Sequence, residues 1–365
     1  LRDAAITLTP PNHDDGHYLN TEELKIELDL MVREMKVRPF LHARFCSPLM
    51  DGTRVAAALI EDKTGRRAIR ARAFIDCTGD ADLVVRAGGT CTCNTDLQPP
   101  TTCVTLSGVS ALRKAIPGFS LQQAVFDPKY PEALPPGFLW SRPLVGNPDL
   151  EMIAGTRVRG ADCSDADQLT AAEMEGRRQA RCIRDLLRAH FPGGEQVHIA
   201  ALPSYIGIRE TRKAICLHRL TADEVLAGTR FADAIGNGSY RVDVHHSDKS
   251  GITFRYLDGT EVYLPIGRPA EKGRWREPTP DTPTFYQIPY RCLVPKGLDN
   301  VLVAGRCIDT DRGAHGATRV MVNCNQMGEA AGVAAALAAD GAKNVADVDT
   351  GCVRQRLMAR GACIL

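Results

Sequence analysis

The chain has 365 residues, of which 44% are hydrophobic, so it can bury a large core and is long enough for two domains. Its formal net charge is +1 and aromatic residues make up 5%, which excludes a basic, base-stacking surface for nucleic acids and gives no attraction to anionic membranes. No apolar run approaches the length of a membrane span.

The thirteen cysteines include no C-x-x-C pair, and the closest spacing separates Cys91 from Cys93 by one residue. An odd count, with Cys216, Cys307 and Cys324 inside apolar runs, indicates reduced and mostly buried thiols in a cytoplasmic protein. A structural role for the closely spaced pair is favoured over metal binding, because closed zinc sites usually use wider ligand spacing. We predict no metal site.

A polar, irregular stretch occupies residues 1–18, and a helix is predicted after it. Asn20 and Glu23 form a capping box at the start of a helix, in which the asparagine side chain accepts hydrogen bonds from the first N–H groups. Apolar residues then recur at helical spacing and form one stripe: Leu24, Leu28, Met31, Val32 and Met35. A strand near residues 37–45 follows.

A hairpin comes next, with predicted arms at residues 54–60 and 67–75 joined at 62–65. Its second arm runs into the turn C-T-G-D at residues 77–80. A glycine there lets the backbone approach a ligand closely, although a plain strand-end turn has the same pattern.

The middle of the chain, residues 90–290, differs in composition from the part before it and has many prolines and glycines near its start. Its predicted elements are long loops at 117–148, a long helix opened by Thr170 and Glu173, a strand at 197–208, a helix opened by Thr221 and Glu224, an antiparallel sheet at 239–263 and a surface loop at 266–284. Adjacent histidines at 245 and 246 lack spaced metal-ligand partners, so a surface or sheet-edge position is favoured for them.

The segment I-G-I-R-E-T-R-K, at residues 206–213, carries a run of charged residues directly after two isoleucines. If it is helical, Arg209 and either Arg212 or Lys213 share one face. A solvated charged turn held by Arg–Glu pairs fits the same spacing. The isoleucines flanking Gly207 suggest instead that the arginines emerge from the edge of a core.

A short apolar strand at 301–304 breaks at Gly305 and is followed by a polar loop and a helix of small residues, up to residue 337. The loop carries Arg306, Asp309, Asp311, Arg312 and His315. Backbone N–H groups at a helix start attract anions, so this unit can form a cradle for a charged ligand. An ordinary βα unit fits the pattern equally well.

His315 is the candidate for proton chemistry, because an unperturbed histidine titrates near physiological pH. A structural role is the alternative.

Four segments, at 19–42, 71–89, 206–240 and 300–337, together resemble the FAD-dependent oxidoreductase family, within the broad superfamily of fumarate reductase/succinate dehydrogenase flavoproteins. The resemblance runs from about residue 19 to the C-terminus. It implies an α/β fold, in which an inserted α+β substrate domain interrupts a Rossmann-like domain that binds FAD. The implied boundaries are 1–89 for the first part of the FAD-binding domain, 90–290 for the insert and 291–365 for the return.

One motif of this family is missing from the chain. The family begins with a strand, a G-x-G-x-x-G turn and a helix that holds the FAD pyrophosphate. The nearest candidate, Gly236-Asn237-Gly238, has Arg241 in place of the third glycine. We therefore expect a Rossmann-like domain that is incomplete at the N-terminus, in a fragment lacking on the order of a hundred residues. A naturally shortened relative that has lost FAD is the alternative.

The resemblance implies FAD as cofactor and a small-molecule substrate. Cofactor contacts are implied for Phe45, Cys77, Thr78, Gly79, Asp80, Gly305, Arg306, Asp309, Gly316, Ala317, Thr318 and Met321. In the implied active site, Arg209, Arg212 and Arg319 bind substrate charge or stabilise the reduced flavin, and His315 moves a proton. The helix after Gly316 would face the N1/C2 carbonyl edge of the flavin.

The predicted function is therefore an oxidoreductase that transfers hydride or electrons between a small organic substrate and bound FAD. Two other functions stay open: a flavin-dependent reductase running in the opposite direction, and a cofactor-free remnant acting as an interaction or scaffold module. The sequence predicts no nucleic-acid or membrane partner and leaves the oligomeric state open.

Overall fold

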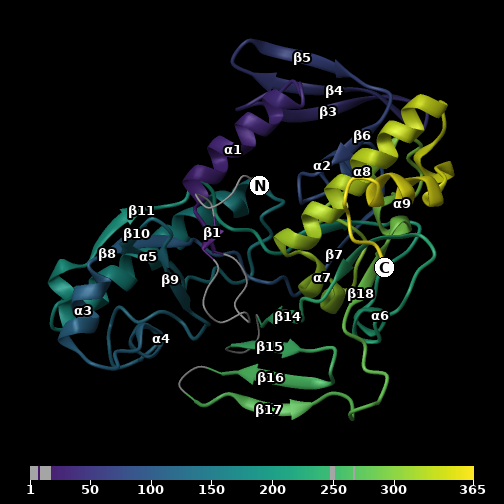
Figure 1. The fold of residues 1–365 in the computed structure, drawn as a ribbon. Helices are drawn as coiled ribbons and strands as arrows, with labels where there is room; N and C mark the ends of the chain where they lie inside the picture. The colour runs from purple at the N-terminus through teal and green to yellow at the C-terminus, as the bar shows by residue number, and fades with distance from the viewer. Residues whose placement is uncertain (1–6, 9–17, 247–250, 266–267) are drawn as a thin grey trace. The chain divides into compact units, whose positions relative to one another are not determined.

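The computed structural model describes residues 7–8, 18–246, 251–265 and 268–365. Helices and strands are mixed along the chain, as predicted for an α/β protein (Figure 1). They form two compact units: unit 1 comprises Leu1–Ala43, Thr101–Arg157 and Glu173–Gly207, and unit 2 comprises Arg44–Pro100, Val158–Ala172 and Ile208–Leu365. The predicted boundaries after residues 89 and 290 both fall inside unit 2, so the three-part functional division stays a prediction.

Unit 1 is built on an antiparallel sheet with strand order β11-β8-β10-β9. Its elements are β1 (Thr7–Leu8), β2 (Tyr18–Leu19), α1 (Thr21–Glu34), β8 (Val104–Ser107), α3 (Val109–Ala115), α4 (Leu121–Val125), β9 (Trp140–Leu144), β10 (Asn147–Ala154), the larger part of α5 (Ala166–His190) and β11 (His198–Ala201). Its core includes Leu106, Ile153, Ile183, Leu186 and Leu187, all fully buried.

Helix α1 begins where predicted, because the Asn20 side chain accepts hydrogen bonds from the N–H groups of Glu22 and Glu23. Its apolar stripe, however, is not buried by any described part of the chain, and Met35 is 69% exposed.

The long helix α5 starts four residues earlier than predicted. Thr170 lies inside it and donates its hydroxyl to the carbonyl of Ala166, so it does not cap the helix. Glu173 instead accepts a hydrogen bond from the N–H of Ile206. The predicted strand at 197–208 is limited to β11.

The described part of unit 2 contains five small sheets and the larger hydrophobic core. Its elements are β3 (Arg44–Asp51), β4 (Arg54–Asp62), β5 (Gly65–Arg70), β6 (Phe74–Asp76), α2 (Asp82–Arg86), β7 (Cys91–Cys93), β12 (Arg212–Ala214), α6 (Ala222–Leu226), β13 (Ala234–Gly238), β14 (Val242–His245), β15 (Ile252–Arg255), β16 (Thr260–Leu264), β17 (Glu271–Arg274), β18 (Tyr286–Pro289), β19 (Val301–Val303), α7 (Arg312–Thr318), α8 (Met321–Gly341) and α9 (Thr350–Met358).

Several local predictions in unit 2 are confirmed. The hairpin is formed by β4 and β5, and the antiparallel sheet of the middle block by β14, β15 and β16. Thr221 and Glu224 form a complete capping box at α6. The strand predicted near 37–45 begins only at Arg44, as β3.

Other predictions in unit 2 need correction. Exposed strand β17 lies in the predicted 266–284 surface loop, whose first two residues are outside the described part of the chain. His245 lies on the edge strand β14, yet it is buried.

A parallel pair of strands brings distant parts of unit 2 together. In β6 and β19, Phe74 lies opposite Val301 and Asp76 opposite Val303. Helix α8 contacts both strands and lies against β6 (Figure 1). Because the strands are parallel, the turns that follow them meet at the same end of the pair, where open α/β sheets bind ligands.

No helix in the described ranges is long and apolar enough to cross a membrane. Within the same residues, no group of three or more histidine, cysteine, aspartate or glutamate side chains is placed to hold a metal ion.

Gly316 packs α7 tightly against β14. A Cβ atom built on this glycine would lie 2.4 Å from the backbone oxygen of Asp243. The sequence places Gly316 in a loop that faces the cofactor, but it is in the interior of α7. A side chain here therefore forces the helix away from the strand.

We expect Gly316→Ala to lower the free energy of unfolding by about 1–3 kcal/mol, because it overpacks this contact. Gly332→Ala is the matched control, since Gly332 is also helical but has no atom within 4 Å of its built Cβ. That change should raise stability by about 0.5–1 kcal/mol. Urea unfolding measures both, and an unchanged midpoint for Gly316→Ala would contradict the packing argument.

Candidate functional site

A cavity of about 270 Å³ lies at the carboxyl ends of β6 and β19. It is lined by Cys77, Thr78, Gly79, Ala304, Gly305, Arg306, Cys324 and Gly328. Five of these residues belong to the two turns that the sequence identified separately as ligand-facing. The other face is supplied by Cys324 and Gly328, one turn apart on α8.

The first turn is shaped by Asp76, a buried residue at the end of β6. Its Oδ1 accepts hydrogen bonds from the backbone N–H and the hydroxyl of Thr78, at 3.0 and 2.7 Å. Its Oδ2 accepts from the N–H groups of Leu83 and Val84 at the start of α2. One carboxylate thus ties the turn to the next helix, and Gly79 takes a left-handed conformation with φ +81°.

The second turn supplies an open glycine and a cation. Gly305 has φ +89°, and a Cβ built on it meets no atom within 4 Å, so its Cα faces open space. Arg306 crosses over Gly79, where a built Cβ would lie 2.3 Å from the guanidinium. Its Nη1 lies 3.2 Å from Oδ1 of Asp80, which places one positive charge at the cavity wall.

The R-E-T-R segment holds the first turn from outside the cavity. The hydroxyl of Thr211 donates to Oδ1 of Asp80 at 2.6 Å. Arg212 donates through Nε to the Asp80 carbonyl and through Nη2 to the carboxylate of Asp82. This segment is extended, and Arg212 begins strand β12, so the helical arrangement considered from the sequence is wrong.

A buried ion pair lies in the same segment, where a solvated charged turn was one expectation. Lys213 and Glu210 have fully buried side chains and are joined at 2.7 Å. Asn94 and the Gln98 N–H also donate to the Glu210 carboxylate. Burial opposes the charge on Glu210, but the charge and hydrogen bond of Lys213 and the hydrogen bond from the Gln98 N–H outweigh it and lower the pKa of the carboxyl.

His315 lies inside α7, is 1% exposed and does not line the cavity. Its Nε2 is 3.0 Å from the carbonyl oxygen of Arg209, and a carbonyl only accepts, so Nε2 carries the hydrogen. Burial and the neighbouring Lys213 lower the pKa of His315 to about 3, although Glu210 acts in the opposite direction. The ring is therefore neutral at physiological pH.

The remaining two arginines of the predicted active site also lie in unit 2. Arg209 donates to the carbonyl of Pro99. Arg319 ends α7, and its Nη2 is 3.4 Å from Oε1 of Gln98 and 3.7 Å from Asp243. Its Nε is buried without a hydrogen-bond partner among the described residues.

Seven predicted cofactor contacts lie outside the cavity lining, and one of them is Asp80, whose contacts with Thr211, Arg212 and Arg306 are given above. Asp309 accepts a hydrogen bond from the N–H of Cys216, and burial raises the pKa of its carboxyl. Phe45 accepts at its carbonyl from Arg86, whose guanidinium lies 5.5 Å from the phenyl ring. Gly316, Ala317 and Thr318 are buried in α7, and Met321 is 64% exposed at the start of α8.

Sequence reasoning missed Asp76, Ala304, Cys324 and Gly328 around the cavity. A signal existed for two of them, since small residues four apart on a helix lie on one face and permit close approach. Asp76 also carries a signal, because it follows an apolar strand and precedes a glycine turn.

The neutral state of His315 predicts how stability changes with pH. Between about pH 6.5 and 3 the unfolded chain binds a proton at this residue and the folded chain does not, so stability is lost as pH falls through this range. His315→Gln should therefore reduce the stability difference between pH 7.5 and 5 by up to about 2 kcal/mol. Urea unfolding at both pH values checks this, with the exposed His198→Gln as control. An unchanged pH dependence in His315→Gln would contradict the assignment.

Comparison with known proteins gives one family match. The profile of the family described as FAD dependent oxidoreductase matches residues 2–357. No curated protein sequence matches the chain.

Solved structures of flavin-dependent enzymes show a distant similarity. The flavin-dependent brominase Bmp2, as a triple mutant, has 12% identity and a TM-score of 0.38, over 94% of this chain and 61% of that one. The myxobacterial chondrochloren halogenase CndH has 13% identity and a TM-score of 0.38, over 97% and 61%. The p-nitrophenol 4-monooxygenase PnpA from Pseudomonas putida DLL-E4 has 15% identity and a TM-score of 0.30, over 52% and 43%.

The chain thus spans 61% of the length of Bmp2 and CndH and 43% of the length of PnpA. The family profile, in contrast, covers nearly all of this chain, including both turns at the glycine-lined cavity and the helix opposite them. The chain belongs to the FAD-dependent oxidoreductase family.

Proposed function

We propose that the chain acts in a flavin-dependent oxidoreductase and that the cavity at the ends of β6 and β19 holds part of FAD. The single observation that carries this proposal is the meeting of two glycine turns, Cys77–Thr78–Gly79 and Ala304–Gly305–Arg306, around one cavity. Family membership supplies the identity of the cofactor.

The residues present fit part of this cofactor. The backbone of Gly305 faces open space. Gly79 has no side chain, and this leaves room for the guanidinium of Arg306 to pack over it. The volume of about 270 Å³ lies just below the range of about 300–1,000 Å³ typical of whole ligand pockets. The cavity is therefore matched to a portion of a dinucleotide, with Thr78, Gly79, Gly305 and Arg306 as the holding residues.

When bound, FAD supplies the capacity to accept or release a hydride or electrons. The chain contributes a positive charge beside it through Arg306, which favours a group that becomes negative on reduction. Arg212 acts as a positioning residue, because its guanidinium is engaged by Asp80 and Asp82.

His315 has a different role from the proton carrier expected from the sequence. It stays neutral and fixes the backbone of Arg209, so it is a positioning residue as well. Arg319 keeps one donor, Nε, without a described hydrogen-bond partner, and we assign to it the anionic group of a small organic substrate.

FAD binding and reduction test the function directly. The chain is titrated with FAD while flavin fluorescence is followed, and the complex is then reduced anaerobically with dithionite. We expect the unchanged chain to bind FAD saturably. The reduction potential of the bound flavin should be lower in Arg306→Gln than in the unchanged chain, because the positive charge is lost. Absence of FAD binding at any concentration would overturn the proposal for this chain.

Gly305→Ala should weaken FAD binding at least tenfold, because its methyl group enters the cavity. Gly297→Ala is the matched control: Gly297 also has a positive φ, of +81°, and open space around its built Cβ, but it does not line the cavity. Both changes carry the same backbone strain of about 1–2 kcal/mol. Equal FAD affinity in the two variants would show that the cofactor binds elsewhere.

A further inference from the structure

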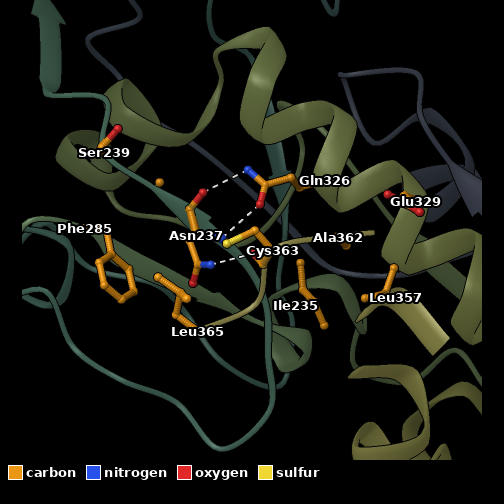
Figure 2. A pocket seen from close by; sticks show the side chains of 11 residues that line it. Ile235, Asn237, Ser239, Phe285, Gln326, Glu329, Leu357, Ala362, Cys363 and Leu365 are labelled. Carbon is orange, nitrogen blue, oxygen red and sulfur yellow. Dashed lines mark hydrogen bonds between the residues drawn. The ribbon is translucent and has the colours of Figure 1, made fainter. Parts of the chain in front are cut away.

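A second cavity, of about 420 Å³, lies on another side of α8. Its volume falls within the range of about 300–1,000 Å³ typical of small-molecule pockets. The lining residues are Ile235, Asn237, Gly238, Ser239, Phe285, Gln326, Glu329, Leu357, Ala362, Cys363 and Leu365 (Figure 2). None of them lines the cavity at the ends of β6 and β19.

One wall of this cavity is held rigid by amide hydrogen bonds. Gln326 accepts from the backbone N–H of Asn237 and donates to its carbonyl, both at 2.9 Å (Figure 2). The Asn237 side chain donates to the carbonyl of Cys363 at 2.6 Å and accepts from Gln287. These amides satisfy one another, so they form a fixed wall and compete little for a ligand.

The rest of the lining has a simple chemistry. Its side chains are mainly apolar, from Ile235, Phe285, Leu357, Ala362 and Leu365. Glu329 is the one aspartate or glutamate of the lining, and no lysine or arginine belongs to it, although the guanidinium of Arg230 lies 3.5 Å from the centroid of the Phe285 ring. Glu329 is exposed and forms no ion pair with a described residue. The cavity thus combines an apolar surface with one carboxylate side chain, that of Glu329.

We propose that this cavity binds a small cationic amphiphile, an amine carried on an apolar body, with its ammonium group at Glu329. The apolar body would lie against Phe285 and Leu357, where it is removed from water. Charge complementarity decides the sign of the ligand, because Glu329 is the only charged side chain of the lining. The site is independent of the FAD cavity and of the proposed redox function.

The test uses three probes of the same shape: 4-phenylbutylamine, neutral 4-phenylbutanol and anionic 4-phenylbutyrate. Cys363 lines the cavity and reports occupancy through its alkylation by iodoacetamide, followed by mass spectrometry. Cys352 is exposed on α9 outside the cavity and is the internal control. The amine should slow alkylation at Cys363 and leave Cys352 unchanged, and calorimetry should show tighter binding of the amine than of the alcohol.

Glu329→Gln should weaken amine binding roughly two- to fivefold, the range that exposed ion pairs give, with little effect on the alcohol. Asp340→Asn, on the same helix but outside the cavity, should leave both affinities unchanged. Ala362→Trp fills the cavity and should abolish binding. Equal affinity for the amine and the carboxylate, unprotected Cys363, or an amine affinity unchanged in Glu329→Gln would each overturn the proposal.

Discussion

The cavity at the ends of β6 and β19 depends on the carboxylate of Asp80. Its side chain is 15% exposed, and a carboxylate removed from water in this way is stable only with compensating donors. Thr211 and Arg306 provide those donors at its Oδ1, and Arg212 donates to its backbone carbonyl. Three segments that are far apart in sequence are thereby held at one turn.

The charged groups behind the cavity form a second layer with a different role. Lys213 and Glu210 are fully buried, and such a pair adds little net stability because desolvation offsets the attraction. Removing one partner is costly, however, since the other charge stays buried. The pair therefore specifies the arrangement of the segment, and its positive end adds to the effect of burial in keeping His315 neutral.

Local signals in the sequence predicted local structure well. Asn20 and the Thr221–Glu224 box start helices as expected, because capping depends on residues within one turn. Thr170 misled the prediction, since residues 166–169 extend α5 upstream of it. His315 and Gly316 were expected in a loop, but Asp311 caps α7 by accepting from the N–H of Ala314 and draws both into a helix.

The site was predictable in part. Both glycine turns were identified from their motifs, whereas the burial of Lys213 and the pairing of β6 with β19 depend on contacts between distant segments. No spacing rule within a single segment contains that information. The second cavity could not be predicted for the same reason, because β13, Phe285, α8, α9 and the last residues of the chain meet there only in the folded protein.

The distance along the chain between the two turns sets a time scale for folding in the cell. Asp80 and Arg306 are 226 positions apart. At ribosomal rates of roughly 5–20 residues per second, about 11–45 s separate their synthesis. The Asp76 turn is local and can form at once, but strand β6 has no parallel partner during that interval. Nascent chains therefore pass through a stage in which β6 presents an unpaired apolar edge, and such edges promote aggregation.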